Sequence, residues 1–173
     1  MYAGNIEDIR ALFRTTFEQA GFQPKVDEDG DFTWDDEVQG ADASEKYPGG
    51  GVLYMTYLGE PWDMYRVEVM YWIMRPVPED RVAELRLLIG LVNSGIAKGT
   101  AFVLIDMGEP NVDISWILTV VTGVATDVVS EKMAGVIPVL LRSLMEQMAP
   151  AYSAVLSGKA TAEQAMATYW PNY

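Results

Sequence analysis

The sequence predicts an α+β fold in which an antiparallel sheet of five to six strands carries helices mainly on one face. Two groups of strand-like segments with alternating apolar residues are separated by a segment with helical periodicity, and helical segments also begin and end the chain. Consecutive strands joined by short turns pair antiparallel, and the helices that flank them pack on one side. The predicted element order is therefore α-β-β-β-β-α-β-β-α, followed by a short terminal helix.

The first predicted elements are a helix over residues 6–20 and a short hairpin. Apolar residues recur in this helix at helical spacing, at Ile6, Ile9, Phe13 and Phe17. Gly21 can adopt the left-handed conformation that ends a helix. Asp29-Gly30 then marks a tight turn between two strands. Residues 36–50 are polar, acidic and rich in glycine, so the sequence predicts a loop there.

Four further strands and a second helix form the middle of the chain. The strands are expected over residues 52–58, 63–74, 100–106 and 112–122. Pro78 suits the first turn of the intervening helix, because a helix needs no backbone N–H at that position. The helix is expected to end at Gly95 or Gly99.

The longest predicted helix begins at Asp127 or Ser130 and ends at Leu156. Its expected core stripe consists of Met133, Val136, Ile137, Leu140, Leu141, Leu144 and Met148. Pro138 lies inside this helix and should bend it, because its ring removes one backbone hydrogen bond. Thr161 has the capping pattern that starts a short last helix.

Composition limits the classes of function. The chain has 173 residues, half of them apolar, with no His, no Cys and a net charge of −13. We predict a single domain over residues 1–156 and a helical appendage over residues 157–173. The negative charge disfavours nucleic acid and anionic membranes as partners, and no apolar run is long enough for a membrane span. No export signal is visible at the start of the sequence, so we expect a cytoplasmic protein.

An acidic segment near the first hairpin has some features of a calcium loop. Asp27, Asp29 and Asp31 alternate around Gly30. A calcium-binding EF-hand needs its Gly at the sixth position and a Glu at the twelfth, whereas here Gly is fourth and Val38 is twelfth. The spacing therefore favours a hairpin turn with solvated acids.

Other polar patterns also fail to define a catalytic site. Residues 95–100 contain the Gly, Lys and Thr of a phosphate loop, but they leave a helix instead of entering one. An acidic patch for a basic peptide, or simply a solvated loop, is formed by Asp35, Asp36, Glu37, Asp42 and Glu45. Carboxylate-based hydrolysis needs two acids at a fixed separation, and nothing selects a pair among Glu60, Asp63, Glu68, Asp106 and Asp113. We predict no catalytic, cofactor-binding or metal-binding residue; a small-ligand-binding or hydrolytic domain is the alternative.

The second face of the predicted sheet is more apolar than a solvent-facing surface should be. A sheet that carries helices on one side is expected to be polar on the other. Met adapts to varied partners and Trp often dominates binding energy. The expected partner-binding residues are Met70, Trp72, Met74, Ile117 and Val121. A homodimer seam is the favoured use of this face, and coverage by the first or the last helix is the alternative.

Three local patterns accompany this element order. They are Leu91-Val92-Asn93-Ser94-Gly95 at a helix end, the strand Ala101-Phe102-Val103-Leu104-Ile105-Asp106, and Ser130-Glu131-Lys132-Met133 at a helix start, with the acidic hairpin at 27–31 before them. Over residues 5–155 the chain thereby resembles the YbjN family of bacterial sensory transduction regulators, which is similar in fold to class I type III secretion chaperones. The long 36–50 segment and the tail after Leu156 depart from that family. The resemblance implies a chaperone-like or regulatory protein that holds protein partners, commonly as a homodimer, and has no catalytic site.

Overall fold

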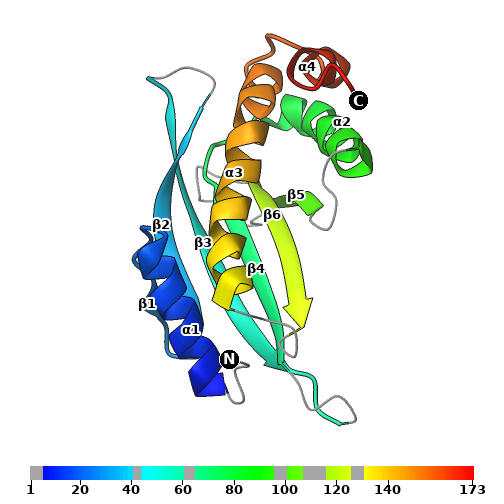
Figure 1. Ribbon diagram of the computed structural model, residues 1–173. Helices are drawn as coiled ribbons and strands as arrows, with labels where there is room; N and C mark the ends of the chain where they lie inside the picture. The colour runs from blue at the N-terminus through cyan, green and yellow to red at the C-terminus, as the bar shows by residue number, and fades with distance from the viewer. Residues whose placement is uncertain (1–5, 41–43, 61–64, 96–100, 107–115, 126–130) are drawn as a thin grey trace.

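The structure is a computed structural model that describes residues 6–40, 44–60, 65–95, 101–106, 116–125 and 131–173. Side chains are described throughout these ranges except at residues 65, 106, 116–125, 131–135 and 138. The α+β class and the antiparallel sheet are confirmed (Figure 1).

The sheet combines two antiparallel groups of strands. Within the described ranges the strands are β1 (Lys25–Val26), β2 (Phe32–Gln39), β3 (Lys46–Tyr57), β4 (Tyr65–Ile73), β5 (Ala101–Asp106) and β6 (Trp116–Ala125). Their spatial order is β1-β2-β3-β4-β6-β5, and every neighbouring pair is antiparallel. The chain therefore runs from β4 through a helix to the edge strand β5 and returns as β6 to pair with β4.

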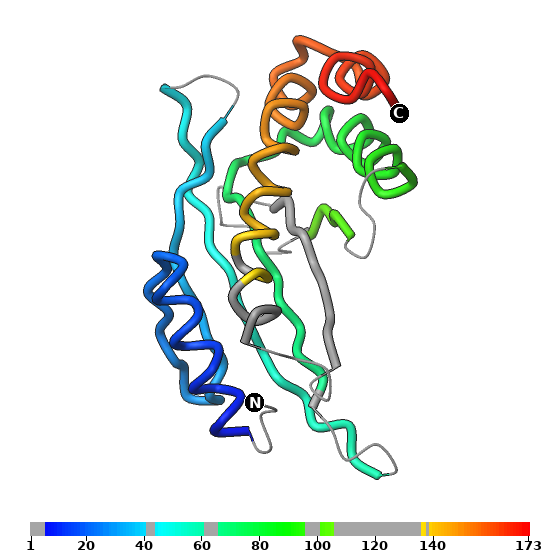
Figure 2. The backbone as a smooth tube through the Cα atoms, in the orientation of Figure 1, coloured from blue at the N-terminus to red at the C-terminus, as the bar shows by residue number. Residues whose placement is uncertain are grey.

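The described helices are α1 (Ile6–Gln19), α2 (Glu79–Gly95), α3 (Glu131–Leu156) and α4 (Ala162–Tyr169). Helices α1 and α3 lie side by side over one face of the sheet, and α2 and α4 gather at the end where the C-terminus lies (Figure 2). The predicted capping box of α4 is present, since the Thr161 hydroxyl accepts from the Gln164 backbone N–H. Ala162 and Ala165 of α4 are fully buried within the main core cluster.

The core fills the space between the sheet and the helices α1 and α3. Alternate residues of the strands point into it, namely Phe32, Trp34, Leu53, Val67, Val69, Tyr71 and Ile73. Phe17 of α1 meets Trp34 edge-on, with ring centroids 4.7 Å apart. Burial of these large side chains is the main favourable term in folding, at about 25 cal/mol per Å² of apolar surface. The residues that alternate with these along each strand point to the other face of the sheet.

The prediction of a loop over residues 36–50 is wrong. Strand β2 continues to Gln39 and β3 begins at Lys46, so Val38 lies opposite Tyr47. Their alternation is obscured in the sequence by acidic residues and three glycines. The glycines serve packing here, because a Cβ at Gly51 would overlap the Trp34 indole. The long hairpin therefore extends the sheet beyond the end of α1 (Figure 1).

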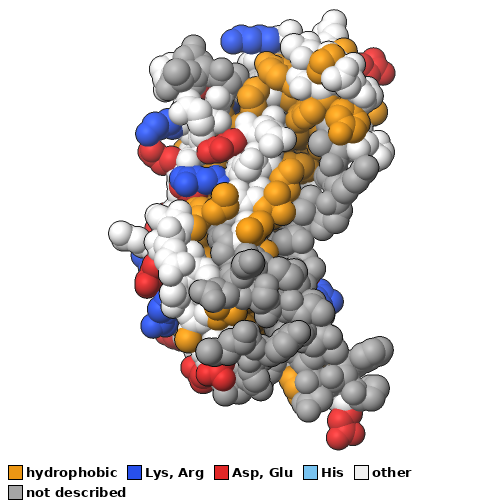
Figure 3. Space-filling model, in the orientation of Figure 1, with side chains coloured by type: hydrophobic (Ala, Val, Ile, Leu, Met, Phe, Trp, Pro, Cys, Tyr) orange, Lys and Arg blue, Asp and Glu red, His pale blue; other side chains and the backbone are white. Residues whose placement is uncertain are grey.

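The predicted core stripe of α3 is partly wrong. Val136 and Leu140 are exposed, whereas Ile137 and Leu141 are buried and the stripe continues through Met145. The first half of α3 is apolar on more than one side, so periodicity alone could not select the buried side. Exposed hydrophobic side chains accordingly gather over α3 (Figure 3). Met133, also predicted for the stripe, has a side chain outside the described set.

Candidate functional site

The open face, as we call the side of the sheet opposite α1 and α3, has an apolar centre. Its described apolar side chains are Val52, Tyr54, Met70, Trp72, Val103 and Ile105. They follow from register, because residues directly opposite on neighbouring strands share a face. The described helices pack elsewhere: α1 packs on α3, and α4 packs on α2 and α3. Neither α1 nor α4 therefore covers the open face, which was the alternative considered from the sequence.

Trp72 lies near the middle of the open face and is half-buried. A Cβ placed on Gly50 would stand 3.4 Å from Trp72 Cζ2, which is an ordinary contact distance, so the indole lies directly against this glycine. Beside it, the Tyr54 hydroxyl donates to Met70 Sδ at 3.7 Å. The sheet thus presents a wide aromatic and sulfur-containing surface.

The five predicted binding residues are placed to different extents. Met70 and Trp72 lie on the open face and are half-buried, and Met74 follows β4 with 38% of its surface exposed. The register sets Val121 opposite Met70 and Ile117 opposite Ile105. The side chains of Ile117 and Val121 lie outside the described set. Partner binding by these five residues remains a prediction.

Ion pairs border the apolar centre of the open face. They join Lys25 to Asp35 at 2.9 Å, Lys46 to Glu37 at 2.7 Å, and Arg66 to Glu68. By register all six residues lie on this face, and they are its charged residues among the described strands. Three positive and three negative charges make the face balanced, although the whole chain carries −13.

A polar cluster lies between the other face of the sheet and α3. The buried Tyr71 hydroxyl donates to Asp36 Oδ2 at 2.5 Å, and Arg142 Nη2 donates to Asp36 Oδ1 at 2.5 Å. The Asp36 side chain is only 8% exposed. Burial, and then the hydrogen bond to Asp36, raise the pKa of Tyr71 above its ordinary value. Tyr71 is therefore a stable hydrogen-bond donor and no candidate for a general base at neutral pH.

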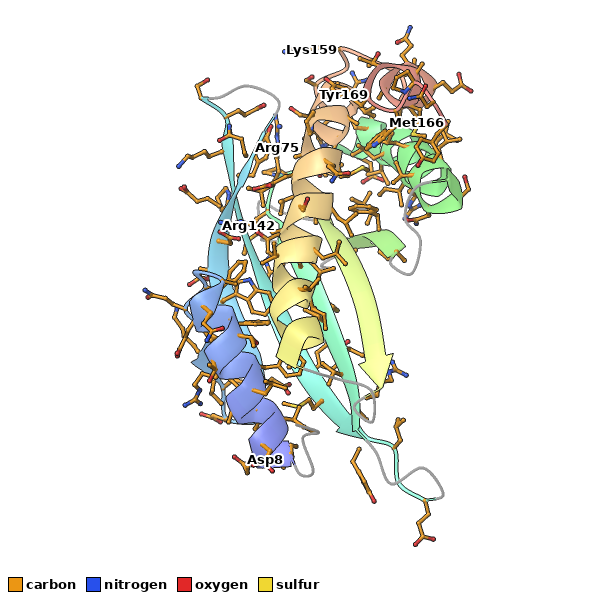
Figure 4. The ribbon with its side chains drawn as sticks, in the orientation of Figure 1. Asp8, Arg75, Arg142, Lys159, Met166 and Tyr169 are labelled. Atoms are coloured by element: carbon orange, nitrogen blue, oxygen red, sulfur yellow. The ribbon has the colours of Figure 1, made fainter. Side chains whose placement is uncertain are left out.

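A second polar cluster surrounds Arg75, just after β4. Arg75 Nη1 donates to Tyr47 Oη at 2.5 Å and to Ser153 Oγ at 3.1 Å, and it lies 3.4 Å from Glu45 Oε1. The guanidinium also lies 4.8 Å from the centre of the Tyr47 ring. Nearby, burial raises the pKa of Tyr152, whose buried hydroxyl has no hydrogen-bond partner among the described residues. Figure 4 shows Arg75 and Arg142 between α3 and the β2–β3 hairpin.

Three residues of the predicted acidic patch, Asp35, Asp36 and Glu37, line a shallow hollow. It has a volume of about 450 Å³ and is lined by Asp35, Asp36, Glu37, Gln39, Lys46 and Arg142. Each of its carboxylates contacts a cationic side chain: Asp35 contacts Lys25, Asp36 contacts Arg142, and Glu37 contacts Lys46. The three carboxylates of the hollow are therefore each paired with a cation.

The remaining sequence candidates do not assemble into a site within the described residues. Asp27 Oδ1 accepts from the backbone N–H of Asp29 at 3.0 Å and of Asp31 at 2.9 Å, so this carboxylate closes the hairpin turn. In the part of the chain that the structure describes, no group of three or more metal-ligating side chains comes together. The Asp42, Asp63 and Asp113 candidates, the Asp106 side chain and most of the 95–100 segment lie outside the described set.

Comparison with family models, curated proteins and solved structures found no match to this chain. The resemblance to the YbjN family therefore stays a prediction. Among the described residues, no helix has the length and apolar character of a membrane span.

Proposed function

We propose that this chain is a non-enzymatic, chaperone-like or regulatory module that binds a protein through the open face of its sheet. The observation that carries the proposal is the arrangement of that face, with Trp72 and Met70 at an apolar centre and ion pairs at the border. Protein interfaces commonly have an apolar core and a polar rim, and contiguous apolar patches are uncommon on monomers.

The favoured partner is a second copy of the chain. Two molecules that each carry a net charge of −13 repel one another over most of their surfaces. The open face has equal numbers of positive and negative charges, so two copies can meet there without that repulsion. A strongly basic partner would instead be attracted to the acidic remainder of the surface.

The edges of the sheet are poor places for self-association. At the β5 edge, both backbone hydrogen-bonding groups of Phe102 are already bonded to the Asn93 side chain, each at 2.8 Å. At the other edge, β1 has only two residues, and the part of β2 that β1 leaves unpaired carries the charged residues Asp35, Asp36 and Glu37, which also disfavour pairing. Short or covered edge strands resist pairing with another chain. Face-to-face packing is therefore the arrangement that we favour for the homodimer.

The chaperone-like part of the proposal rests on the resemblance stated for residues 5–155 and on the α+β arrangement of the elements. The non-enzymatic part rests on the lack of His and Cys, together with the pairing of the acids in the hollow beside Arg142. A cytoplasmic location remains the expectation of the sequence.

Site-specific photo-crosslinking tests the proposal in cells. We expect a benzoylphenylalanine in place of Trp72 to form protein adducts after irradiation, because that position lies at the centre of the binding surface. The same amino acid in place of Tyr169, an exposed aromatic residue on α4, is the control and should form few. An absence of protein adducts at position 72 would reject protein binding by this face, whereas adducts to other proteins alone would reject only the homodimer.

A further inference from the structure

The outer part of the β2–β3 hairpin differs from the rest of the sheet. We term residues 36–39 and 45–48 the arm. Pairing between β3 and β4 extends only to Gly49, which lies opposite Ile73, and the last bond runs from Met74 N–H to the Pro48 carbonyl at 2.7 Å. Beyond that point the arm is a two-stranded ribbon, which projects past α1 and runs beside α3 (Figures 1 and 2). A ribbon of two strands has little stability of its own in water.

Contacts with α3 hold the arm in place. Asp36 is bonded to Arg142, and the Tyr47 and Ser153 hydroxyls lie 3.0 Å apart. Arg142 and Ser153 lie three helical turns apart on α3, and the fully buried Ala149 lies between them in sequence. The arm in turn buries Val38 completely and Tyr47 to 6% exposure. The closed arm therefore depends on two arginine clusters, at Arg142 and Arg75, and on a small apolar contact.

Residues 49–51, all glycine, follow the arm directly and are the first residues of β3 that pair with both β2 and β4. Glycine has the widest choice of backbone conformations, so a change of direction costs least there. Trp72 lies against Gly50 on the open face, and Trp34 lies against Gly51 on the core side. A movement of the arm about these glycines would therefore change the backbone against which Trp72 packs.

We propose that the arm is a strap that opens from α3 about residues 49–51 while the rest of the sheet stays folded. The Arg142–Asp36 and Arg75–Tyr47–Ser153 contacts keep it closed. Opening uncovers Val38, Tyr47 and the side of α3 that carries Ala149, which together form an apolar surface that the closed molecule lacks. Opening also changes the packing around Trp72. This regulatory effect, unlike the opening itself, rests on the proposed function of the open face.

Amide hydrogen exchange of the full-length chain tests the strap. We expect amides of residues 37–39 and 46–47 to exchange faster than those of β4 residues 67–71, since they would open without global unfolding. Arg75→Met and Arg142→Met each remove hydrogen bonds of a charged donor, so each should speed amide exchange in the arm by about 10- to 100-fold. Neither substitution should change the ratio between the exchange rate of the β4 amides and the rate of global unfolding. Lys46→Gln is the matched control, because its exposed ion pair with Glu37 lies within the arm, and it should change exchange by about threefold or less.

The readout separates the strap from general destabilisation and from the proposed function. If arm and β4 amides exchange through the same opening in the unmodified chain, or if both arginine variants speed the two sets equally, the strap is rejected. Ser153→Ala, a smaller change at the same contact, provides the same comparison should an arginine variant fail to fold. Crosslinking at position 72 is measured separately, so failure of protein binding by the open face leaves the exchange result to be judged by itself.

Discussion

Asn93 is a residue whose importance only the structure reveals. Its side-chain amide donates to the Phe102 carbonyl and accepts from the Phe102 N–H, both at 2.8 Å. One side chain thereby joins the last turn of α2 to the edge strand β5. The sequence places Asn93 in a helix end, but no periodic pattern indicates that it substitutes for a neighbouring strand.

Replacement of Asn93 should weaken the attachment of α2 to the sheet. We expect Asn93→Ala to lower the free energy of unfolding by about 1–2 kcal/mol, because two hydrogen bonds are lost and water replaces them only in part. Ser94→Ala is the control, since among the described residues the Ser94 hydroxyl bonds back to Leu91 of its own helix, and it should cost less than about 0.5 kcal/mol. Urea denaturation measures both, and equal effects would contradict the role assigned to Asn93.

Tyr71 should make the free energy of unfolding decrease at alkaline pH. Its raised pKa means that the folded chain keeps the phenol proton at pH values where the unfolded chain, with an ordinary value near 10, has lost it. Stability from this residue is therefore complete below about pH 10 and falls by about 1.4 kcal/mol per pH unit above it. In the Tyr71→Phe variant, the free energy of unfolding should fall by about 1.4 kcal/mol less per pH unit between about pH 10 and pH 11.5.

The control for this measurement is Tyr169→Phe, which removes a phenol from an exposed position on α4. Tyr71→Phe should also lower stability at neutral pH by about 1–3 kcal/mol, since Asp36 loses a buried donor. Identical slopes for Tyr71→Phe and the unmodified chain would show that the phenol of Tyr71 does not remain protonated as the structure implies.

At the scale of the elements, a glycine of β3 and a glycine of α2 differ in the space available for a side chain. A Cβ at Gly51 would overlap the Trp34 indole, whereas a Cβ at Gly90 would meet nothing within 4 Å. Gly51→Ala should therefore lower the free energy of unfolding by at least about 2 kcal/mol through overpacking. Gly90→Ala should raise it by about 0.5–1 kcal/mol, because alanine favours the helix.

Thermal or urea unfolding measures both glycine variants in the same buffer. Because the expected effects have opposite signs, a general effect of added side-chain volume cannot account for them. A neutral Gly51→Ala variant would contradict the close approach of Trp34 to β3.

Local patterns predicted the elements best where one face of an element meets the core. Of the predicted stripe of α1, Ile9, Phe13 and Phe17 are buried as expected and Ile6 is half-buried. Patterns failed where other terms decide the outcome. The arm forms strands because Val38 and Tyr47 are buried and because α3 supplies Arg142 as a charged partner for Asp36, although its composition is that of a loop.

The polar clusters could not be predicted from the sequence. Asp36 and Arg142 are separated by 106 positions, as are Tyr47 and Ser153. Each residue alone is an ordinary charged or polar residue, and only the long hairpin brings the partners together. The open face is a different case, because the period of β4 placed Met70 and Trp72 opposite the core from sequence alone.

At the scale of the whole molecule, the distribution of charge separates the open face from the remaining surface. The charged residues of the face among the described strands sum to zero, so the net charge of −13 resides elsewhere in the chain. Attraction between two copies would come from the apolar centre, and repulsion would come from the acidic remainder. These two terms respond differently to salt.

The proposed homodimer should therefore become tighter as salt is added. Between about 20 mM and about 300 mM NaCl, screening weakens the long-range repulsion and leaves apolar contacts intact, so we expect the dissociation constant to fall by about three- to tenfold. Analytical ultracentrifugation of the full chain measures it. Trp72→Glu should abolish self-association at both salt concentrations, whereas Glu18→Gln, on the exposed side of α1, should preserve it and modestly favour it at low salt. A dimer that loosens as salt is added would mean that ion pairs between copies, and not the apolar centre of the open face, hold it together.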